Sequence, residues 1–207
     1  MPKEPPVWDT IFEQEGLVFP DPHEDMPHLA QMLEERQART VLDVGCGTGR
    51  HVLYLAQRGF RVSGVDNAPT ALTVTQRRLQ EAGLTADLRL HDIFDTLPFP
   101  NAAFDALMST QVIHHARIAQ IRGLVAEMVR ILKPNGLVFV TVPQVQNQAT
   151  QFQPIEPGTF LPLDGREAGL PHHYFTPEEL RDVFQQFEVI DFHVDRDQHS
   201  CLTAIKR

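Results

Sequence analysis

The sequence predicts a single α/β domain built on a doubly wound, mostly parallel sheet with helices on both faces. Short apolar runs alternate along the chain with helical patterns, and right-handed crossovers turn such an alternation into a parallel sheet. The run Leu137–Val142 is unbroken in hydrophobicity, as expected of a strand that is covered on both sides. A chain of 207 residues, 42% of them hydrophobic, can bury one sizeable core, whereas two domains would be cramped.

Ahead of the first strand, residues 1–38 are expected to form an arm and a helix. The first part of this segment is rich in proline and acidic residues, and Trp8 and Phe12 are spaced as on one face of a short helix. Leu29 and Leu33 then recur at helical spacing. We expect the arm to pack on the domain and the helix to deliver the chain to the sheet.

The first part of the core is predicted to contain three strands separated by two helices. The strands are Val41–Val44, Arg61–Val65 and a short one at Leu88–Leu90. Gly59 and Gly83 follow the two helical patterns, where a left-handed residue commonly ends a helix.

The second part of the core is predicted to contain two strands joined by a long helix. The strands are Phe104–Met108 and Leu137–Val142, and Pro134 ends the helix between them. One apolar stripe marks that helix, formed by Ile121, Leu124, Val125, Met128, Val129 and Leu132. Residues 39–143 therefore form the predicted core of the domain.

Regular patterning stops after Pro143 for about thirty residues, which is longer than an ordinary loop in a compact domain. Residues 144–175 are therefore expected to be a functional or mobile insertion.

Residues 176–207 are expected to form a helix and a pair of strands. The helix begins with a capping box and carries apolar residues at Leu180, Val183, Phe184 and Phe187. The strands Val189–Val194 and Leu202–Lys206 are too close in sequence for a helical crossover, so they should be antiparallel neighbours.

Composition excludes several classes of function. A formal net charge of -9 argues against broad binding to nucleic acid, which depends on Lys and Arg neutralising phosphates. No apolar stretch approaches the roughly 20 residues that span a bilayer, and the N-terminus lacks an apolar signal core, so we expect a cytoplasmic protein without a membrane partner. Cys46 and Cys201 are too few for a disulfide framework or for a zinc site made of thiolates alone.

The segment V-L-D-V-G-C-G-T-G-R at 41–50 predicts a strand, a glycine turn and a helix that together hold a small polar cofactor. Glycines permit positive φ and leave room for a ligand, while the following helix directs free N–H groups toward it. A dinucleotide site requires G-x-G-x-x-G, but here the third glycine comes one residue early and Arg50 takes its place. Asp43, inside the strand, suits a ligand with an ammonium group better than a pyrophosphate.

Four further segments follow this turn in a fixed order, namely G-V-D-N at 64–67, H-D-I-F at 91–94, F-D-A-L-M-S-T-Q-V-I-H-H at 104–115 and L-K-P-N-G at 132–136. With these motifs the chain resembles, from about Arg39 to the C-terminus, the S-adenosylmethionine-dependent methyltransferases of the Rossmann-like class, in particular small enzymes that act on metabolites. The resemblance implies a seven-stranded sheet whose last strand is antiparallel, and S-adenosyl-L-methionine as the cofactor.

The resemblance also implies which residues bind the cofactor. Asp43 would accept hydrogen bonds from the methionine ammonium, Asp66 would accept both ribose hydroxyls, and Asp92 would take the adenine amino group. The implied set is Asp43, Gly45, Cys46, Gly47, Gly49, Asp66, Asn67, Asp92, Ile93 and Thr110, with Ser109 and Gln111 beside Thr110 passing under the ribose and sulfonium. The alternative for the glycines is an ordinary tight turn, and for each acid a solvated loop end.

No residue is assigned a catalytic role with the same clarity. Methyl transfer from a sulfonium is an in-line displacement, and only a hydroxyl acceptor requires a base. His114 and His115 follow the fourth strand close to the expected acceptor, but they could equally pack or cap the next helix. His173 and Tyr174, with the neighbouring His172, could line the acceptor pocket or form a rigid turn ahead of the last helix.

Two other patterns suggest chemistry that we do not expect. A row of alternating residues could offer metal ligands, comprising Asp191, His193, Asp195, Asp197 and His199. We interpret it as a polar outer face opposite Ile190, Phe192 and Val194, and we expect no metal. Cys46 lies in the glycine turn, where small residues of many kinds fit, so a nucleophilic role is not expected.

We therefore expect methyl transfer from S-adenosylmethionine to a small-molecule acceptor, with the arm and residues 144–175 closing over it. Two alternatives remain, a nicotinamide-dependent oxidoreductase and a regulatory protein that binds the cofactor without transferring a methyl group. No N-P-P-Y run follows the fourth strand, which lowers the odds of an exocyclic DNA amine as acceptor. No motif identifies the acceptor, since fold does not choose among metabolites.

Overall fold

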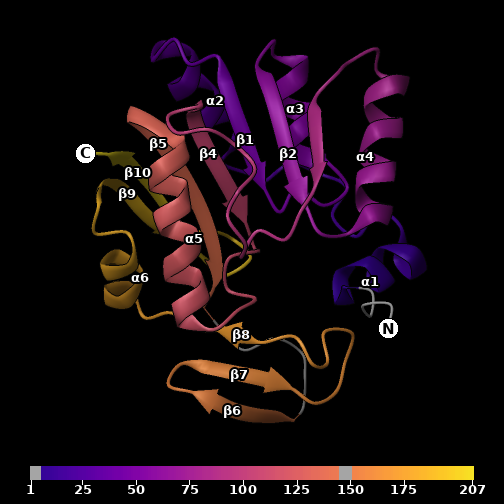
Figure 1. The fold of residues 1–207 in the computed structure, drawn as a ribbon, viewed down its shortest axis with the longest axis vertical. Coiled ribbons are helices and arrows are strands. Elements are labelled where there is room, and N and C mark those ends of the chain that lie inside the picture. The colour runs from indigo at the N-terminus through magenta and orange to yellow at the C-terminus, as the bar shows by residue number, and fades with distance from the viewer. Residues whose placement is uncertain (1–5, 145–150) are drawn as a thin grey trace.

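The computed structural model describes residues 6–144 and 151–207, and its centre is one seven-stranded sheet (Figure 1). The strand order is β3-β2-β1-β4-β5-β10-β9, with β10 antiparallel to both of its neighbours and the others parallel. Its strands are β1 (Thr40–Val44), β2 (Arg61–Asp66), β3 (Asp87–Leu90), β4 (Phe104–Thr110), β5 (Leu132–Pro143), β9 (Phe187–Val194) and β10 (His199–Lys206). The predicted doubly wound sheet with an antiparallel last strand is confirmed.

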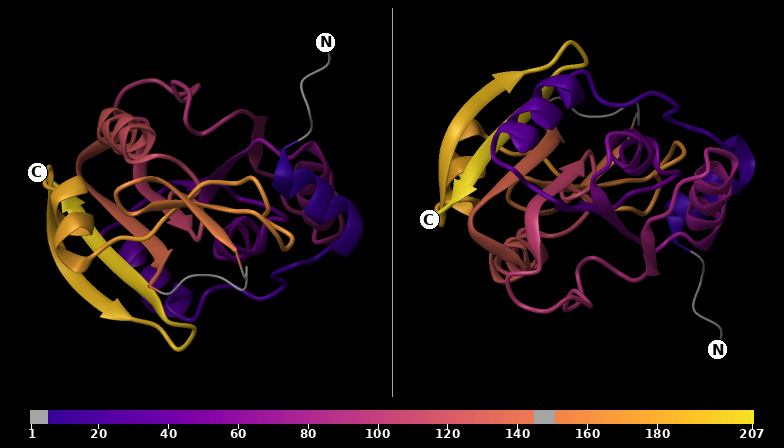
Figure 2. Two further views of the ribbon diagram at one scale, coloured as in Figure 1. Left: turned by 90° about the horizontal axis from the view of Figure 1, so that it is seen from below. Right: turned by 90° about the horizontal axis from the view of Figure 1, so that it is seen from above.

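Helices cover both faces of this sheet. One face packs against α2 (Met26–Glu35), α3 (Arg50–Gln57) and α4 (Pro69–Glu81). The other packs against α5 (Ile118–Ile131) and α6 (Pro177–Val183), as the end-on views in Figure 2 make visible. Burying one large aliphatic side chain of these interfaces stabilises the fold by about 1.5–3 kcal/mol.

The chain reverses the direction in which strands are added between β1 and β4, because β2 and β3 lie on one side of β1 and β4 lies on the other. At such a switch point the loops after the two strands diverge and leave a crevice at the carboxyl ends of the strands. Figure 1 shows these ends directed toward α1 (Val7–Glu15) and toward the segment that follows β5.

The N-terminal arm contains α1, which packs against the start of α4. Phe12 contacts Ala68 and Ala71, with Trp8 against the same group. The Asp9 carboxylate accepts a hydrogen bond from the Thr70 N–H at 2.9 Å, which satisfies one of the free donors at the start of α4. Of the predicted arm, residues 1–5 lie outside the described residues.

The segment after β5 differs from its prediction. We expected no regular structure, but the described part folds into a three-stranded sheet of β6 (Phe152–Glu156), β7 (Thr159–Pro162) and β8 (His172–His173). These strands are short and contain prolines at 154 and 162, so the sequence shows no clear alternation of apolar and polar residues. Proline also lacks a backbone N–H donor and is restricted to edge strands and strand ends, which argues against a strand in the sequence. Residues 145–150 of the predicted insertion are outside the described residues.

The C-terminal part confirms the helix cap and corrects the length of the helix. The Thr176 hydroxyl accepts a hydrogen bond from the Glu179 N–H at 3.1 Å, as the capping box predicted. However, α6 ends at Val183, and Phe187 begins β9 instead of extending the helix. Phe184 and Phe187 still belong to the same core, and their rings lie 5.6 Å apart across the turn between helix and strand.

Among the described residues, none of the helices combines the length and the apolar character needed to cross a lipid bilayer.

Candidate functional site

A cavity of about 260 Å³ opens at the carboxyl edge of the sheet, at the switch point between β1 and β4. Its wall comes from the glycine turn, the ends of β2 and β4, the loop after β3, the arm and the segment before β8. The lining residues are Trp8, Phe12, Phe19, Gly45, Cys46, Gly47, Thr48, Arg50, His51, Asp66, Asn67, Asp92, Ile93, Phe94, Thr110, Gln111, Val112, His115 and Leu170. Of the ten cofactor residues implied by the sequence, all but Asp43 and Gly49 line it.

The glycine turn needs glycine for two different reasons. Gly45 has a φ of 77°, and a Cβ there would lie 2.5 Å from the Val112 side chain, so only glycine lets the loop after β4 approach the turn. Gly49 has a φ of 79°, and a Cβ there would lie 2.4 Å from Thr75 on α4. Gly49 therefore allows α3 to pack against α4, and it does not form part of the cavity wall.

Asp43 is buried at the end of β1 without a counterion at hydrogen-bond distance. It is 1% exposed, and neither carboxylate oxygen has a hydrogen-bond partner within the described part of the chain. Burial is the main cause that raises the pKa of Asp43 to about 7. The positive charge of Arg50 lowers this pKa, and the nearby carboxylate of Asp66 raises it further. An unpaired buried carboxylate is costly for the fold, so its presence points to a ligand that pairs with it.

His51 faces Asp43 from the first turn of α3. Its Nε2 accepts a hydrogen bond from the His23 N–H at 3.1 Å, so the remaining ring proton of the neutral imidazole lies on Nδ1. That Nδ1 is 3.8 Å from Asp43 and 3.4 Å from the Thr110 hydroxyl. Burial holds the pKa of His51 well below its ordinary value, so it does not supply a positive charge to Asp43.

Asp66 ties the end of β2 to the glycine turn. Its carboxylate accepts hydrogen bonds from the Gly47 N–H at 2.8 Å and the Ala68 N–H at 2.9 Å. Burial raises the pKa of Asp66 from its ordinary value, and these two donors act in the opposite direction. Asp66 lines the cavity, so it holds the turn in shape and keeps part of its carboxylate next to the cavity.

The loop after β3 and the end of β4 complete the opposite wall. Asp92 accepts a hydrogen bond from the Phe94 N–H at 3.0 Å, which directs Ile93 into the protein, where it is 6% exposed. Thr110 and Gln111 line the cavity, and Gln111 has a φ of 59°, an uncommon value for a residue other than glycine. Ser109 does not reach it, because its hydroxyl donates to the Val44 carbonyl at 2.7 Å inside the sheet.

The four catalytic candidates are in different places. His115 lines the cavity, with its ring 5.9 Å from that of Trp8, and burial lowers its pKa to about 3. His114 is 4% exposed and lies behind the wall, and burial also lowers its pKa. His173 is outside the lining, where its ring contacts the Thr159 hydroxyl at 2.7 Å and the Glu179 carboxylate at 3.2 Å.

Tyr174 is also outside the cavity lining. Its ring lies 6.3 Å from that of His172 and 6.0 Å from that of Phe160 on β7. The structure therefore brings His115 to the cavity. It places His173 on β8 against Thr159 of β7 and Glu179 of α6, and Tyr174 directly after β8 beside Phe160 of β7.

The sequence did not single out several residues of the wall. Trp8, Phe12 and Phe19 of the arm cover one side, and the aromatic spacing of the first two was the available signal. Arg50 reaches the cavity with its guanidinium 5.1 Å from the centre of the Phe19 ring. His51 had no signal, because a histidine in the first turn of a helix is common on any surface.

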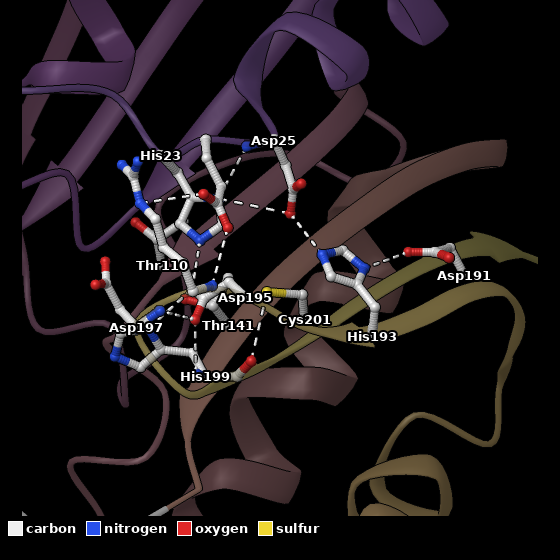
Figure 3. A network of polar contacts seen from close by, with 12 residues as sticks. His23, Asp25, Thr110, Thr141, Asp191, His193, Asp195, Asp197, His199 and Cys201 are labelled. Atoms are coloured by element: carbon white, nitrogen blue, oxygen red, sulfur yellow. Dashed lines mark hydrogen bonds and ion pairs between the residues drawn. The ribbon is translucent and has the colours of Figure 1, made fainter.

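The alternating polar row near the C-terminus is only partly the outer face that we expected, since Asp191 and Asp197 are exposed but Asp195 is not (Figure 3). Asp195 is 5% exposed and contacts both His23 and His199 at 2.9 Å. By contrast, Ile190 and Val194 are 41% and 43% exposed. The prediction was wrong for Asp195 because β9 ends at Val194, so the alternation of a strand does not continue to this residue, which lies in the turn before β10.

Comparisons with known proteins agree with this geometry. Residues 41–136 match a family model described as a methyltransferase domain. The chain is 34% identical over 99 residues to a ubiquinone biosynthesis O-methyltransferase of Methylocella silvestris, covering 48% of this chain and 38% of that one. It is 32% identical over 111 residues to a demethylmenaquinone methyltransferase of Tropheryma whipplei, covering 53% and 44%.

A solved S-adenosylmethionine-dependent methyltransferase from Methanosarcina mazei has a TM-score of 0.73 at 25% identity, covering 90% of this chain and 98% of that one. Over its core the chain is therefore similar to S-adenosylmethionine-dependent methyltransferases. It spans less than half the length of the two quinone-pathway methyltransferases named above, but nearly the full length of the Methanosarcina methyltransferase. The Methanosarcina neighbour depends on S-adenosylmethionine, the cofactor that the sequence motifs implied for this chain.

Proposed function

We propose that the protein transfers a methyl group from S-adenosylmethionine to a small, largely apolar acceptor by in-line displacement. The observation that carries the proposal is Asp43, whose buried carboxylate has two oxygens without a hydrogen-bond partner beside a glycine turn. A ligand with an ammonium group satisfies that carboxylate, and a pyrophosphate does not.

In this proposal the remaining parts of the cofactor follow the cavity wall. Asp43 accepts hydrogen bonds from the methionine ammonium, directly or through water. Asp66 accepts from the ribose hydroxyls with the part of its carboxylate that faces the cavity, while Asp92 and Ile93 take the adenine end. Thr110 lies under the sulfonium end. The cofactor supplies the reactive methyl group on a positively charged sulfur.

The chain itself aligns the acceptor and excludes water. Beyond the proposed cofactor residues the cavity wall holds five polar residues and six apolar ones, namely Trp8, Phe12, Phe19, Phe94, Val112 and Leu170. Such a wall keeps water from competing with the acceptor and favours an apolar or aromatic substrate. The two relatives named for ubiquinone and menaquinone biosynthesis support a quinone-like acceptor ring as the first class to test.

We also propose that the arm (residues 1–38) and the insertion (residues 144–175) enclose the acceptor together above the cofactor-binding core (39–143). Arg166 of the insertion pairs with Glu15 of the arm at 3.2 Å, and its guanidinium is 5.5 Å from the Trp8 ring. Leu170 lines the cavity from the insertion, as Trp8 does from the arm. The Arg166–Glu15 pair is exposed, so separating these two side chains costs little free energy.

Titration calorimetry with S-adenosylmethionine and with NAD tests the proposal against the oxidoreductase alternative. We expect saturable binding of S-adenosylmethionine and none of NAD, and the reverse result contradicts the proposal.

Transfer of a labelled methyl group to hydroxylated quinone precursors then tests catalysis. Donor binding without any labelled product would favour the regulatory alternative.

Affinity for S-adenosylmethionine is expected to fall as the solution is acidified below neutrality. Only the ionised Asp43 carboxylate pairs with the ammonium, and the pKa of Asp43 is about 7 in the free protein. The dissociation constant should therefore rise about tenfold for each pH unit below that value, measured by calorimetry between about pH 5.5 and 7.5. A flat profile over this range would show that the ammonium does not pair with Asp43.

Trp8 is the single tryptophan of the chain, so its fluorescence should report cofactor binding directly. Replacing Trp8 by alanine is expected to weaken cofactor binding about tenfold, because about 1–2 kcal/mol of aromatic contact on the open side of the cavity is lost. Trp8→Phe should retain most of the affinity, since it keeps the contact with Phe12, whose ring is 5.5 Å away. If Trp8→Ala binds S-adenosylmethionine as tightly as the unmodified protein does, the arm is not part of the binding site.

A further inference from the structure

We propose that His114, His115 and His172, together with Glu167, form a binding site for a zinc-like divalent metal ion on the wall of the cavity. Each histidine offers one ring nitrogen, and these nitrogens all lie within 4.8 Å of one another. Tetrahedral zinc holds its nitrogen ligands roughly 3.4 Å apart, given bond lengths of about 2.0–2.1 Å. The rings therefore need only a small inward movement to share one ion.

All three imidazoles are removed from water. His114 is 4% exposed and His172 is 1% exposed, while the side chain of His115 is 8% exposed. An imidazole binds a metal ion through the lone pair of one ring nitrogen, and it is the commonest side-chain metal ligand. The Nδ1 atom of His114 is buried and has no hydrogen-bond partner within residues 6–144 and 151–207. An unsatisfied nitrogen inside a histidine cluster is a vacant ligand position.

The contacts of His172 also indicate a cation. Its Nδ1 is 2.8 Å from the Leu170 carbonyl, which can only accept, so this nitrogen carries a proton. Its Nε2 is 3.1 Å from a Glu167 carboxylate oxygen, and the other oxygen of Glu167 is 3.8 Å from His115 Nε2. An ion placed here would therefore be within reach of His172, His115 and the Glu167 carboxylate together. A backbone carbonyl that orients a histidine in this way is common around metal ligands.

The site would join two parts of the protein next to the cofactor cavity. His114 and His115 follow β4 in the core, whereas Glu167 and His172 belong to the insertion. The His173 N–H donates to the His114 carbonyl at 2.8 Å, so the two segments are already in contact. Because His115 lines the cavity, the ion would lie beside the acceptor. This last point rests on the proposed function, but the metal site itself does not.

Two other groups of potential ligands lie in the network of Figure 3, and they are a weaker choice. Asp195 accepts hydrogen bonds from the backbone N–H groups of Asp197 and His199 in addition to its histidine contacts. His193 lies between Asp25 at 3.1 Å and Asp191 at 2.7 Å. Burial raises the pKa of the Cys201 thiol, which keeps it protonated and a poor ligand. In that network Asp195 is satisfied by hydrogen bonds and His193 by its two carboxylate neighbours.

Binding of Co²⁺ and Zn²⁺ to the full chain, after removal of any purification tag, tests the proposal. We expect about one ion per chain by elemental analysis and the visible absorption of tetrahedral Co²⁺, which Zn²⁺ should displace. His172→Gln and His114→Gln should each lower the affinity for Co²⁺ at least about tenfold. His193→Gln, in the competing network, is the matched control and should bind as the unmodified protein does.

Failure of the metal site and failure of the proposed function give different results. Calorimetry with S-adenosylmethionine is run on the same samples, and retained binding in His172→Gln shows that the variant is folded. If the unmodified protein binds S-adenosylmethionine but neither ion, or if only His193→Gln loses the ion, the metal proposal is wrong. If the ion binds but S-adenosylmethionine does not, the metal site stands and the proposed function fails. Should His172→Gln not fold, Glu167→Gln provides the same comparison.

Discussion

Replacing Asp43 by asparagine is expected to stabilise the protein and, at the same time, to abolish its binding of S-adenosylmethionine. The carboxylate is buried without a partner, and its pKa rises from 3.8 to about 7 on folding. Asparagine has nearly the same shape and carries no charge. The unmodified protein therefore retains an unfavourable buried charge that the variant lacks.

The sign of the effect depends on pH. Because the folded state holds the proton more tightly than the unfolded state, the contribution of Asp43 to stability is most favourable below pH 3.8 and is lost as the pH rises to about 7. Above neutrality the full cost is present, at most about 4 kcal/mol for three pKa units. Asp43→Asn should thus raise the free energy of unfolding at about pH 8 and change it little at about pH 4, measured by denaturant unfolding.

Loss of binding is the second half of this prediction. Removing the charge that pairs with the ammonium inside the protein should weaken S-adenosylmethionine binding by at least about 100-fold, since breaking a buried ion pair costs about 3–5 kcal/mol. Calorimetry measures this change. A variant that is more stable and still binds the cofactor normally would contradict the role of Asp43.

Asp105→Asn is the matched control, because this aspartate also lies in the sheet and has the opposite environment. It accepts hydrogen bonds from the Arg39 and Thr40 N–H groups, each at 2.8 Å, and from Lys133 at 2.7 Å. These donors hold the pKa of Asp105 below its ordinary value, so its contribution to stability is present at neutral pH and lost on acidification. The control should be less stable than the unmodified protein at neutral pH, with unchanged cofactor binding.

Replacing Asp66 by alanine is expected to abolish cofactor binding and to destabilise the fold. The change leaves the Gly47 and Ala68 N–H groups without their acceptor, which costs about 1–3 kcal/mol, partly offset by removal of a buried charge. The glycine turn then loses the contact that holds it against the end of β2. We expect a loss of binding greater than about 100-fold by calorimetry, together with a lower midpoint of denaturant unfolding.

Asp66→Asn separates the two functions of this residue. Its amide oxygen can still accept one of the two backbone hydrogen bonds, so most of the stability should return. Asparagine cannot accept from two ribose hydroxyls as a carboxylate does, so cofactor affinity should remain low. Normal affinity in Asp66→Ala would show that the ribose is held elsewhere in the cavity.

Local patterns were sufficient to predict the central sheet and most of the cofactor wall. Each strand of the core was marked by its own apolar run, and right-handed crossovers left few ways to arrange them. Because ligands bind where parallel strands end, residues just after a strand could be placed at one edge without knowing any distance. Asp66, Asp92 and Thr110 reach the cavity for this reason.

Other features were not accessible from local patterns. Gly49 belongs to the same motif as Gly45 but packs against Thr75 on α4 instead of lining the cavity. Asp195 continues a polar alternation in the sequence, yet it lies in a turn and is buried against His23, which is 172 positions away. Contacts of this kind depend on where distant segments meet.

The sequence by itself therefore determined the fold class, the implied cofactor and the edge of the sheet where the cavity lies, since these follow from short-range periodicity and from the chemistry of single motifs. Only the tertiary structure decided that Asp43 lacks a partner, that His114, His115 and His172 meet, and that Trp8 covers the cavity. Burial and pairing are set by every element packed around a side chain. For that reason the charge, ligands and surroundings of a side chain depend on the folded structure and cannot be read from its neighbours in the sequence.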